Sequence, residues 1–237
     1  LRMWDVTSAA RVDDFIAISH FVSQRIEKYY RRHSEVVNPF VDLEAFHPTA
    51  GEKGAYYLVV SAFAPYKKVE LAITACESLG RKLLIVGSGQ EEKKLRALAG
   101  KHTQFLGNLP DSELPDLYAG AQAFLFPGLE DFGITPLEAM ACGTPVIAYG
   151  AGGVLETVEE GKTGLFFPEQ TTESLAQAIL QFEKTSSAFT RQACRERALF
   201  FSKSRFQKEI LGTIAKKLDE CPHLTRRTQL PDFYLDA

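Results

Sequence analysis

The sequence has few cysteines and no long apolar run, and these two absences narrow the classes of protein to which the chain can belong. Its 237 residues hold four widely separated cysteines, at 76, 142, 194 and 221. This spacing fits neither a zinc site nor a redox pair, so we expect reduced thiols in a cytoplasmic protein. No apolar run reaches the roughly 18 residues that a transmembrane helix requires. Peripheral attachment to the inner face of a membrane stays open.

Basic charge and metal-binding patterns are also scarce. The formal net charge is −3, which argues against general nucleic-acid binding. The five histidines show no metal or triad spacing, and no Asp-x-Asp pair is present. We therefore expect no metal and no cofactor. The start, Leu1–Asp5, lacks both a signal-peptide pattern and an initiating Met, so we expect a piece of a longer chain.

Apolar and amphipathic segments alternate from Tyr56 onward. Strand patterns occupy 56–61, 82–86, 104–106, 123–126, 146–148 and 164–167, with helical patterns between them. Because strands that alternate with helices form βαβ units, we predict an α/β fold with a doubly wound, Rossmann-like parallel sheet. Further helices are expected at 171–184, 188–201 and 204–218. An earlier strand–helix–strand pattern covers 13–42.

The stretch from 123 to 147 is the centre of the chain. A short strand ends at Pro127-Gly128, and Thr135 followed by Pro136 predicts a helix start with Thr135 as N-cap. Gly143 occupies the position expected after the helix C-terminus. The loop 127–134 thus joins the carboxyl end of a parallel strand to a helix N-terminus. Ligands bind at that edge of open sheets, and helix N-termini favour anions.

Glu130 and Glu138 flank this loop with seven residues between them. A phosphate at the helix N-terminus would leave both carboxylates within reach of hydroxyls on either side of it, and ionised carboxylates accept hydrogen bonds from hydroxyls. A sugar nucleotide has this form. From the residues alone, two plainer interpretations stay open: Glu138 as the capping-box partner of Thr135, and Glu130 as an ordinary loop acid.

The Glu130-x7-Glu138 pair, with Phe132-Gly133 and the run Glu-Ala-Met-Ala-Cys-Gly-Thr-Pro-Val-Ile at 138–147, resembles the signature of the retaining family 4 glycosyltransferases, in particular their mannosyltransferase-like branch. The resemblance covers about residues 19–217 and implies the C-terminal, donor-binding half of a two-domain GT-B architecture. It divides the chain into a remnant of the N-terminal domain with the hinge (1–50), a Rossmann-like nucleotide-sugar-binding domain (51–201), a C-terminal crossing helix (202–220) and a tail (221–237).

The resemblance also implies roles for the site residues. Lys67 would neutralise the donor diphosphate, Glu130 would bind hydroxyls of the donor sugar, and Glu138 would bind the ribose. The backbone from Asp131 through Phe132, Gly133, Ile134 and Thr135 would face the sugar and phosphate, with further donor contacts at Gly87 and Gly107. Ala62 stands where the family usually has an arginine, so one diphosphate clamp is missing.

The implied activity is transfer of a sugar, with retention of its anomeric configuration, from a nucleoside diphosphate to a saccharide or lipid-linked acceptor. GDP-mannose is the first expected donor, and UDP-sugars follow. Without the N-terminal domain the chain should bind nucleotide but transfer little sugar. Alternatives are a degenerate, non-catalytic sugar-nucleotide-binding module, which Ala62 would mark, and an enzyme of related architecture such as a sugar-nucleotide epimerase or a phosphorylase.

Overall fold

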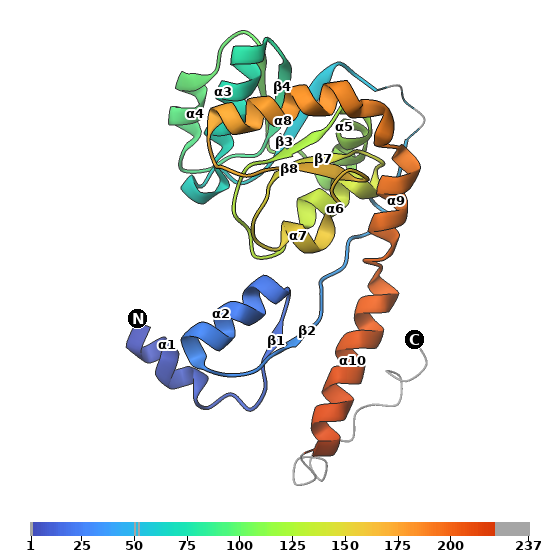
Figure 1. The fold of residues 1–237 in the computed structure, drawn as a ribbon. Helices are drawn as coiled ribbons and strands as arrows, with labels where there is room; N and C mark the ends of the chain where they lie inside the picture. The colour runs from blue at the N-terminus through green and yellow to red at the C-terminus, as the bar shows by residue number, and fades with distance from the viewer. Residues whose placement is uncertain (1, 50, 52, 221–237) are drawn as a thin grey trace.

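The computed structural model describes residues 2–49, 51 and 53–220, so the predicted tail at 221–237 lies outside the described residues. An α/β body forms the upper part of the view in Figure 1, and a smaller N-terminal segment lies below it. The last helix, α10 (Lys203–Glu220), leaves the body and runs down beside that segment.

A six-stranded parallel sheet forms the centre of the body. Its strands are β3 (Tyr56–Val60), β4 (Lys82–Val86), β5 (Thr103–Gly107), β6 (Phe124–Phe126), β7 (Val146–Tyr149) and β8 (Gly164–Phe167). Their spatial order is β5-β4-β3-β6-β7-β8. The predicted doubly wound sheet is therefore confirmed. The order reverses between β3 and β6, which pair through Leu58 and Phe124, and ligands of such sheets bind at this switch point.

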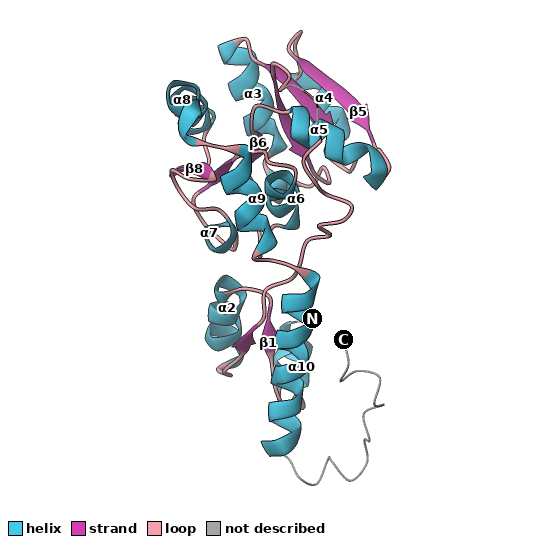
Figure 2. Ribbon diagram, turned by 90° about the vertical axis from the view of Figure 1, so that its right-hand side faces the viewer, coloured by secondary structure: helices cyan, strands magenta, loops and turns pink. Residues whose placement is uncertain are grey.

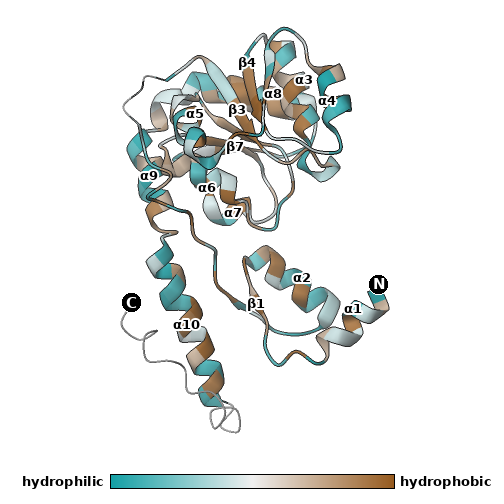
Figure 3. Ribbon diagram, turned by 180° about the vertical axis from the view of Figure 1, so that it is seen from behind, coloured by the Kyte–Doolittle hydropathy of each residue, from teal (hydrophilic) through white to brown (hydrophobic). Residues whose placement is uncertain are grey.

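Helices cover both faces of the sheet, which explains why the strands are apolar without alternation. One face packs against α3 (Val69–Leu79), α4 (Glu92–Leu98) and α8 (Thr172–Thr185). The other packs against α5 (Leu114–Gly120), α6 (Ile134–Ala141) and α9 (Arg191–Leu199). Figure 2 shows the sheet between these two layers, and Figure 3 shows the apolar strands at the centre. Leu58 and Phe124 are fully buried.

The N-terminal segment is only partly as predicted. Helix α2 (His20–Tyr30) begins after Ser19, whose Oγ accepts from the Val22 amide at 3.0 Å, as expected of an N-cap. Helix α1 (Arg2–Ala9) was not predicted. The flanking strands β1 (Ile16–Ala17) and β2 (Glu35–Val36) have two residues each, far shorter than the predicted ones, because among the described residues they pair only with each other.

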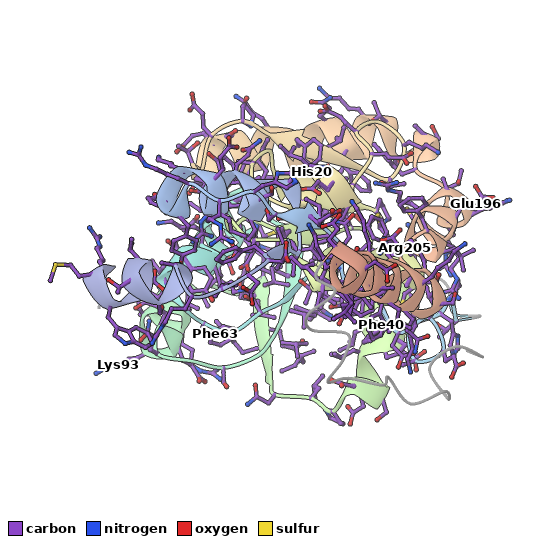
Figure 4. All side chains as sticks on the ribbon, turned by 90° about the horizontal axis from the view of Figure 1, so that it is seen from below. His20, Phe40, Phe63, Lys93, Glu196 and Arg205 are labelled. Carbon is purple, nitrogen blue, oxygen red and sulfur yellow. The ribbon has the colours of Figure 1, made fainter. Side chains whose placement is uncertain are left out.

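Helix α10 joins the N-terminal segment to the body. Arg205 donates to the carbonyls of Asn38 at 2.8 Å and Pro39 at 3.3 Å. Phe206 packs on Phe40, with ring centroids 5.4 Å apart. Figure 4 shows Phe40 and Arg205 at this end of the helix. Helix α10 thus holds the residues that follow β2 in place.

The start of α6 differs from the prediction. The N-cap is Gly133, with φ 85°, and Ile134 is the first helical residue. Thr135 is therefore inside the helix, so the predicted N-cap is wrong, and with it falls the alternative interpretation of Glu138 as the capping-box partner of Thr135. A glycine here can take the left-handed conformation that the turn into the helix requires. The helix end is as predicted: Gly143 donates to Met140 O and Thr144 to Ala139 O, both at 2.9 Å, which is a Schellman motif.

Candidate functional site

Lys67 and Glu130 lie together at the carboxyl edge of the sheet. Lys67 belongs to the short 3-10 helix Pro65–Lys67 after β3, and Glu130 to the loop after β6. Lys67 Nζ forms an ion pair with Glu130 Oε1. The two side chains are 21% and 16% exposed, and the Oε1 atom itself is buried. The switch point therefore holds a largely desolvated cation–anion pair.

Gly128 allows the loop that carries Glu130 to approach the turn that carries Lys67 closely. A Cβ on Gly128 would lie 3.0 Å from Lys67 Cα and 3.1 Å from Tyr66 O. The carbonyl of the preceding residue, Pro127, accepts from Gln170 Nε2 at 2.9 Å. The loop that carries Glu130 is thereby fixed against the backbone of the Lys67 turn.

A pocket of about 310 Å³ opens beside this pair. Its walls come from Lys67, from the run 130–135, from Phe126 and from two residues of the N-terminal part, Ile18 and Pro39. Among the described residues that line it, Lys67 is the one cation. A larger hollow of about 650 Å³ lies at the opposite, amino edge of the sheet, beside Gly54 and Gln122, and none of the predicted site residues lines it.

The N-terminus of α6 faces the pocket. Gly133, Ile134 and Thr135 all line it, and Gly133 makes no side-chain cap hydrogen bond. The first amides of a helix have no partner within the helix and favour an anion. Phe132 fixes their position, because its ring is 2% exposed and packs edge-on against Phe201 at 5.9 Å. Asp131 is exposed and pairs with Arg25 rather than pointing to the ion pair.

Glu138 does not line this pocket. It lies on α6 four residues after Ile134, so it projects from the same helix face one turn further along. Its Oε2 accepts from Tyr118 Oη at 2.8 Å. Burial raises the pKa of Glu138, while the Tyr118 hydrogen bond opposes the shift and Asp111 adds to it. A half-buried carboxylate with one oxygen already bonded leaves the other for a ligand hydroxyl.

The remaining predicted residues follow neighbouring strands at the same edge. Ala62 is exposed after β3 and offers no charge. Gly87 follows β4, with φ 129°, and its amide donates to Gly107 O at 2.8 Å. A Cβ on Gly87 would lie 1.9 Å from Ser61 O, whereas a Cβ on Gly107 would meet nothing within 4 Å. Gly87 thus serves close packing of two loops, and Gly107 borders open space.

Glu156 on α7 (Val154–Thr157) connects the body to the N-terminal segment, a contact that the sequence did not predict. Glu156 accepts hydrogen bonds from the first amides of α2. The preceding glycines allow this loop to approach the Glu130 loop: Gly153 N donates to Glu130 O at 2.9 Å, and a Cβ on Gly153 would lie 2.3 Å from Asp131 O. The pair Gly152-Gly153 was the signal in the sequence for this close contact.

Two further findings concern the described residues as a whole. No group of three or more His, Cys, Asp or Glu side chains there could hold a metal ion. Within the same residues, no helix combines the length and apolarity needed to cross a bilayer.

Comparison with known proteins identifies the family of the chain. Residues 42–199 match the family described as "Glycosyl transferases group 1". A D-inositol 3-phosphate glycosyltransferase of Mycobacteroides abscessus is 32% identical over 208 residues, which cover 78% of this chain and 46% of that protein. A GDP-mannose-dependent alpha-(1-6)-phosphatidylinositol monomannoside mannosyltransferase of Mycobacterium tuberculosis is 31% identical over 176 residues, covering 62% and 46%. The chain thus spans about half the length of these relatives.

Solved structures show the same fold. Sucrose-phosphate synthase from Thermosynechococcus elongatus superposes with a TM-score of 0.80 at 24% identity, over 92% of this chain and 61% of that one. HepE of Anabaena in complex with UDP-glucose also superposes at 0.80, with 21% identity, over 91% and 67%. At these identities the likeness concerns the fold alone.

Proposed function

The chain belongs to the glycosyl transferases group 1 family, and on that premise we propose that it is the donor-binding half of a retaining glycosyltransferase. The observation that supports this most directly is the Lys67–Glu130 pair, placed in a pocket at the switch point of the sheet. A cation, a helix N-terminus and a carboxylate at one edge suit a diphosphate joined to a sugar.

In the proposed reaction, the bond between the anomeric carbon and the diphosphate oxygen breaks, and the electron pair leaves with the nucleoside diphosphate. Lys67 and the first amides of α6 stabilise the negative charge that develops there. Glu130 holds hydroxyls of the sugar, and its position beside Lys67 keeps the two functions adjacent. The acceptor hydroxyl then attacks the anomeric carbon on the same face of the sugar, and its proton passes to the departing diphosphate oxygen. We place the acceptor site outside the described residues and expect a saccharide or lipid-linked acceptor.

We propose GDP-mannose as the donor, with UDP-sugars as the next candidates. Sequence relatives at 31% identity are named GDP-mannose-dependent mannosyltransferases, which favours GDP-mannose. The HepE structure contains UDP-glucose, but its 21% identity carries less weight for the donor. Glu138 would bind the ribose in either case, because both nucleotides carry the same diol.

A second candidate function is a degenerate module that binds a sugar nucleotide without transferring it. Ala62 favours it, because an alanine supplies none of the bidentate hydrogen bonds that an arginine would give a diphosphate. Lys67 is then the cation that the pocket offers the diphosphate. It would hold the diphosphate less tightly than Lys67 together with an arginine at position 62. We expect the chain to need no metal.

Calorimetric titration of the chain with GDP, GDP-mannose, UDP and UDP-glucose tests the proposal. We expect the chain to bind at least one nucleoside diphosphate and its sugar, with the guanosine compounds bound most tightly. Lys67→Ala should bind them much more weakly. The matched control is Lys68→Ala, since Lys68 adjoins Lys67 but does not line the pocket. Absence of binding to all four compounds would refute the proposal for this chain. A transfer assay on a chain extended by an N-terminal domain, with and without Ala62→Arg, then separates the enzyme from the module.

A further inference from the structure

Helix α2 holds the loop of the candidate site through Asp131. Ser19 Oγ, which is fully buried, donates to Asp131 O at 2.5 Å. Arg25 Nη1 donates to Asp131 Oδ1 at 2.5 Å, but both of these side chains are about half exposed. Solvent therefore screens the Arg25 ion pair, and ion pairs of this kind add little stability. The buried hydrogen bond from the Ser19 side chain to the Asp131 carbonyl therefore contributes more than the Arg25 ion pair.

Glu156 makes the denser set of contacts on the other side of α2. Its Oε1 accepts from the backbone amides of His20 at 2.7 Å and Phe21 at 3.3 Å. Its Oε2 lies 2.9 Å from His20 Nδ1 and accepts from Asn38 Nδ2 at 3.3 Å. The carboxylate thus satisfies free amides at the positive end of α2, where an anion is favourable. Figure 4 labels His20 at this position on α2.

The element that carries Glu156 is itself rigidly held. Arg197 of α9 donates to Glu156 O at 2.5 Å and to Thr157 O at 2.8 Å. The Glu156 side chain is only 19% exposed, so solvent screens its contacts less than those of Arg25. A fixed carboxylate on the body therefore holds the N-terminal segment.

These contacts bear directly on the pocket. Ile18 and Pro39 form part of its wall, and they adjoin Ser19 and Asn38, the latter being held by Glu156. Asn38 Nδ2 also donates to Ile18 O at 3.1 Å. If α2 moved away from Glu156, the pocket would lose this wall and the Asp131 loop would lose Ser19. A ligand that fills the pocket binds the attached arrangement better, so binding and attachment are linked.

We infer that Glu156 is a positioning residue of the donor site, which attaches α2 to the body and thereby completes the pocket for the sugar of the donor. This inference rests on the proposed function, since it takes a sugar nucleotide as the ligand. It predicts that loss of the Glu156 charge weakens binding of the nucleoside diphosphate sugar more than binding of the nucleoside diphosphate alone. The diphosphate touches Lys67 and α6, whereas the sugar reaches the wall from Ile18 and Pro39.

The experiment compares wild type, Glu156→Gln and Glu160→Gln by amide hydrogen exchange and by calorimetry with GDP-mannose and GDP. Glu160 is the matched control, because it is an exposed acid four residues on with no hydrogen bond or ion pair among the described side chains. In Glu156→Gln we expect faster exchange at residues 20–22 and a loss of GDP-mannose affinity of about tenfold, equal to about 1.4 kcal/mol. GDP affinity should change by less than about threefold, equal to about 0.6 kcal/mol. Unchanged exchange in β3 and β4 would show that the variant is folded.

The outcomes separate this inference from the proposed function. Faster exchange at 20–22 with equal affinity for GDP-mannose would make Glu156 a purely structural contact and overturn the inference. Unchanged exchange at 20–22 would also overturn it, since Glu156 would then not hold α2. If wild type bound neither GDP-mannose nor UDP-glucose, nor either diphosphate, the proposed function would fail, and the inference with it. A His20→Ala variant that retained slow exchange at Phe21 would support the backbone contacts as the essential ones.

Discussion

The Lys67–Glu130 pair gives the sharpest test, because replacing each partner should affect stability and binding differently. In Lys67→Ala, the buried Oε1 atom of Glu130 loses the cation beside it. In Glu130→Gln, Lys67 loses its anion but can still turn to solvent, being 21% exposed. The double variant removes both charges at once. These three variants and wild type form a double-mutant cycle.

The expected magnitudes follow from burial. Unit charges 4 Å apart attract by about 4 kcal/mol at an effective dielectric constant of 20, and partial exposure and the entropy of the lysine side chain reduce this. Leaving a buried polar group without a partner costs about 1–3 kcal/mol, which is the loss of unfolding free energy that we expect for Lys67→Ala. Glu130→Gln should lose less, about 1 kcal/mol, the net contribution of one hydrogen bond, because Lys67 can then turn to solvent. The double variant should recover part of the larger loss, with a coupling energy of about 0.5–3 kcal/mol.

Binding should follow another pattern. Lys67→Ala should weaken GDP binding by about 10–150-fold, since a hydrogen bond to a charged group contributes about 1.5–3 kcal/mol. Glu130→Gln should bind GDP at least as tightly as wild type, because the carboxylate no longer competes for Lys67. It should bind GDP-mannose more weakly, because Glu130 would hold the sugar. Urea denaturation and calorimetry measure the two quantities. Additive stability losses, or equal losses of GDP affinity in both single variants, would refute the reasoning.

Three other changes test the surrounding site. Burial raises the pKa of Glu138. The ionised carboxylate therefore lowers the free energy of unfolding at neutral pH. This loss disappears as the pH falls through the folded-state pKa of Glu138. At pH 7, Glu138→Gln should therefore be at least as stable as wild type in urea denaturation. Its GDP affinity should fall about tenfold, equal to about 1.4 kcal/mol. A clear loss of stability would contradict this. Ala62→Arg should tighten GDP binding about tenfold or more by adding a hydrogen bond of about 1.5–3 kcal/mol to the diphosphate, and unchanged affinity by calorimetry would show that position 62 does not reach the ligand. Gly153→Ala would bring a Cβ within 2.3 Å of Asp131 O, so it should lower the unfolding free energy by about 1–3 kcal/mol and reduce GDP-mannose affinity. Its control, Gly212→Ala, meets nothing within 4 Å on a helix and should leave both unchanged or raise stability slightly.

The fold was predictable because the central strands of the body are buried on both faces. Runs such as 56–61 and 82–86 have no polar alternation, which is typical of a parallel sheet covered by helices. The order of the strands places the ends of β3 and β6 side by side, and this alone brings Lys67 to Glu130 from 63 residues away. The N-terminal segment was less predictable, because a strand of two residues such as β1 is defined by its partner and hardly by its own sequence.

The helix start at 133 shows where local signals mislead. Thr135-Pro136 has the form of an N-cap followed by proline at the first helical position. Yet proline lacks an amide hydrogen and is tolerated throughout the first turn, so its place within that turn is not fixed by the sequence. Gly133, with φ 85°, sets the start instead. The shift by two residues leaves the Thr135 side chain beside the pocket rather than on the helix end, and it leaves Glu138 free of any capping role.

Two glycines at neighbouring strand ends show why a ligand-binding glycine cannot be told from a packing glycine in the sequence. Gly87 and Gly107 both have positive φ; Gly87 follows β4 and Gly107 is the last residue of β5, at the same edge of the sheet. The Ser61 carbonyl occupies the space where a Gly87 side chain would lie, and the Gly87 amide is bonded to Gly107 O, so neither is available to a ligand. Of the two, Gly107, the last residue of β5, has open space on its Cβ side, so a substitution there is the better test of the donor contact proposed for these glycines.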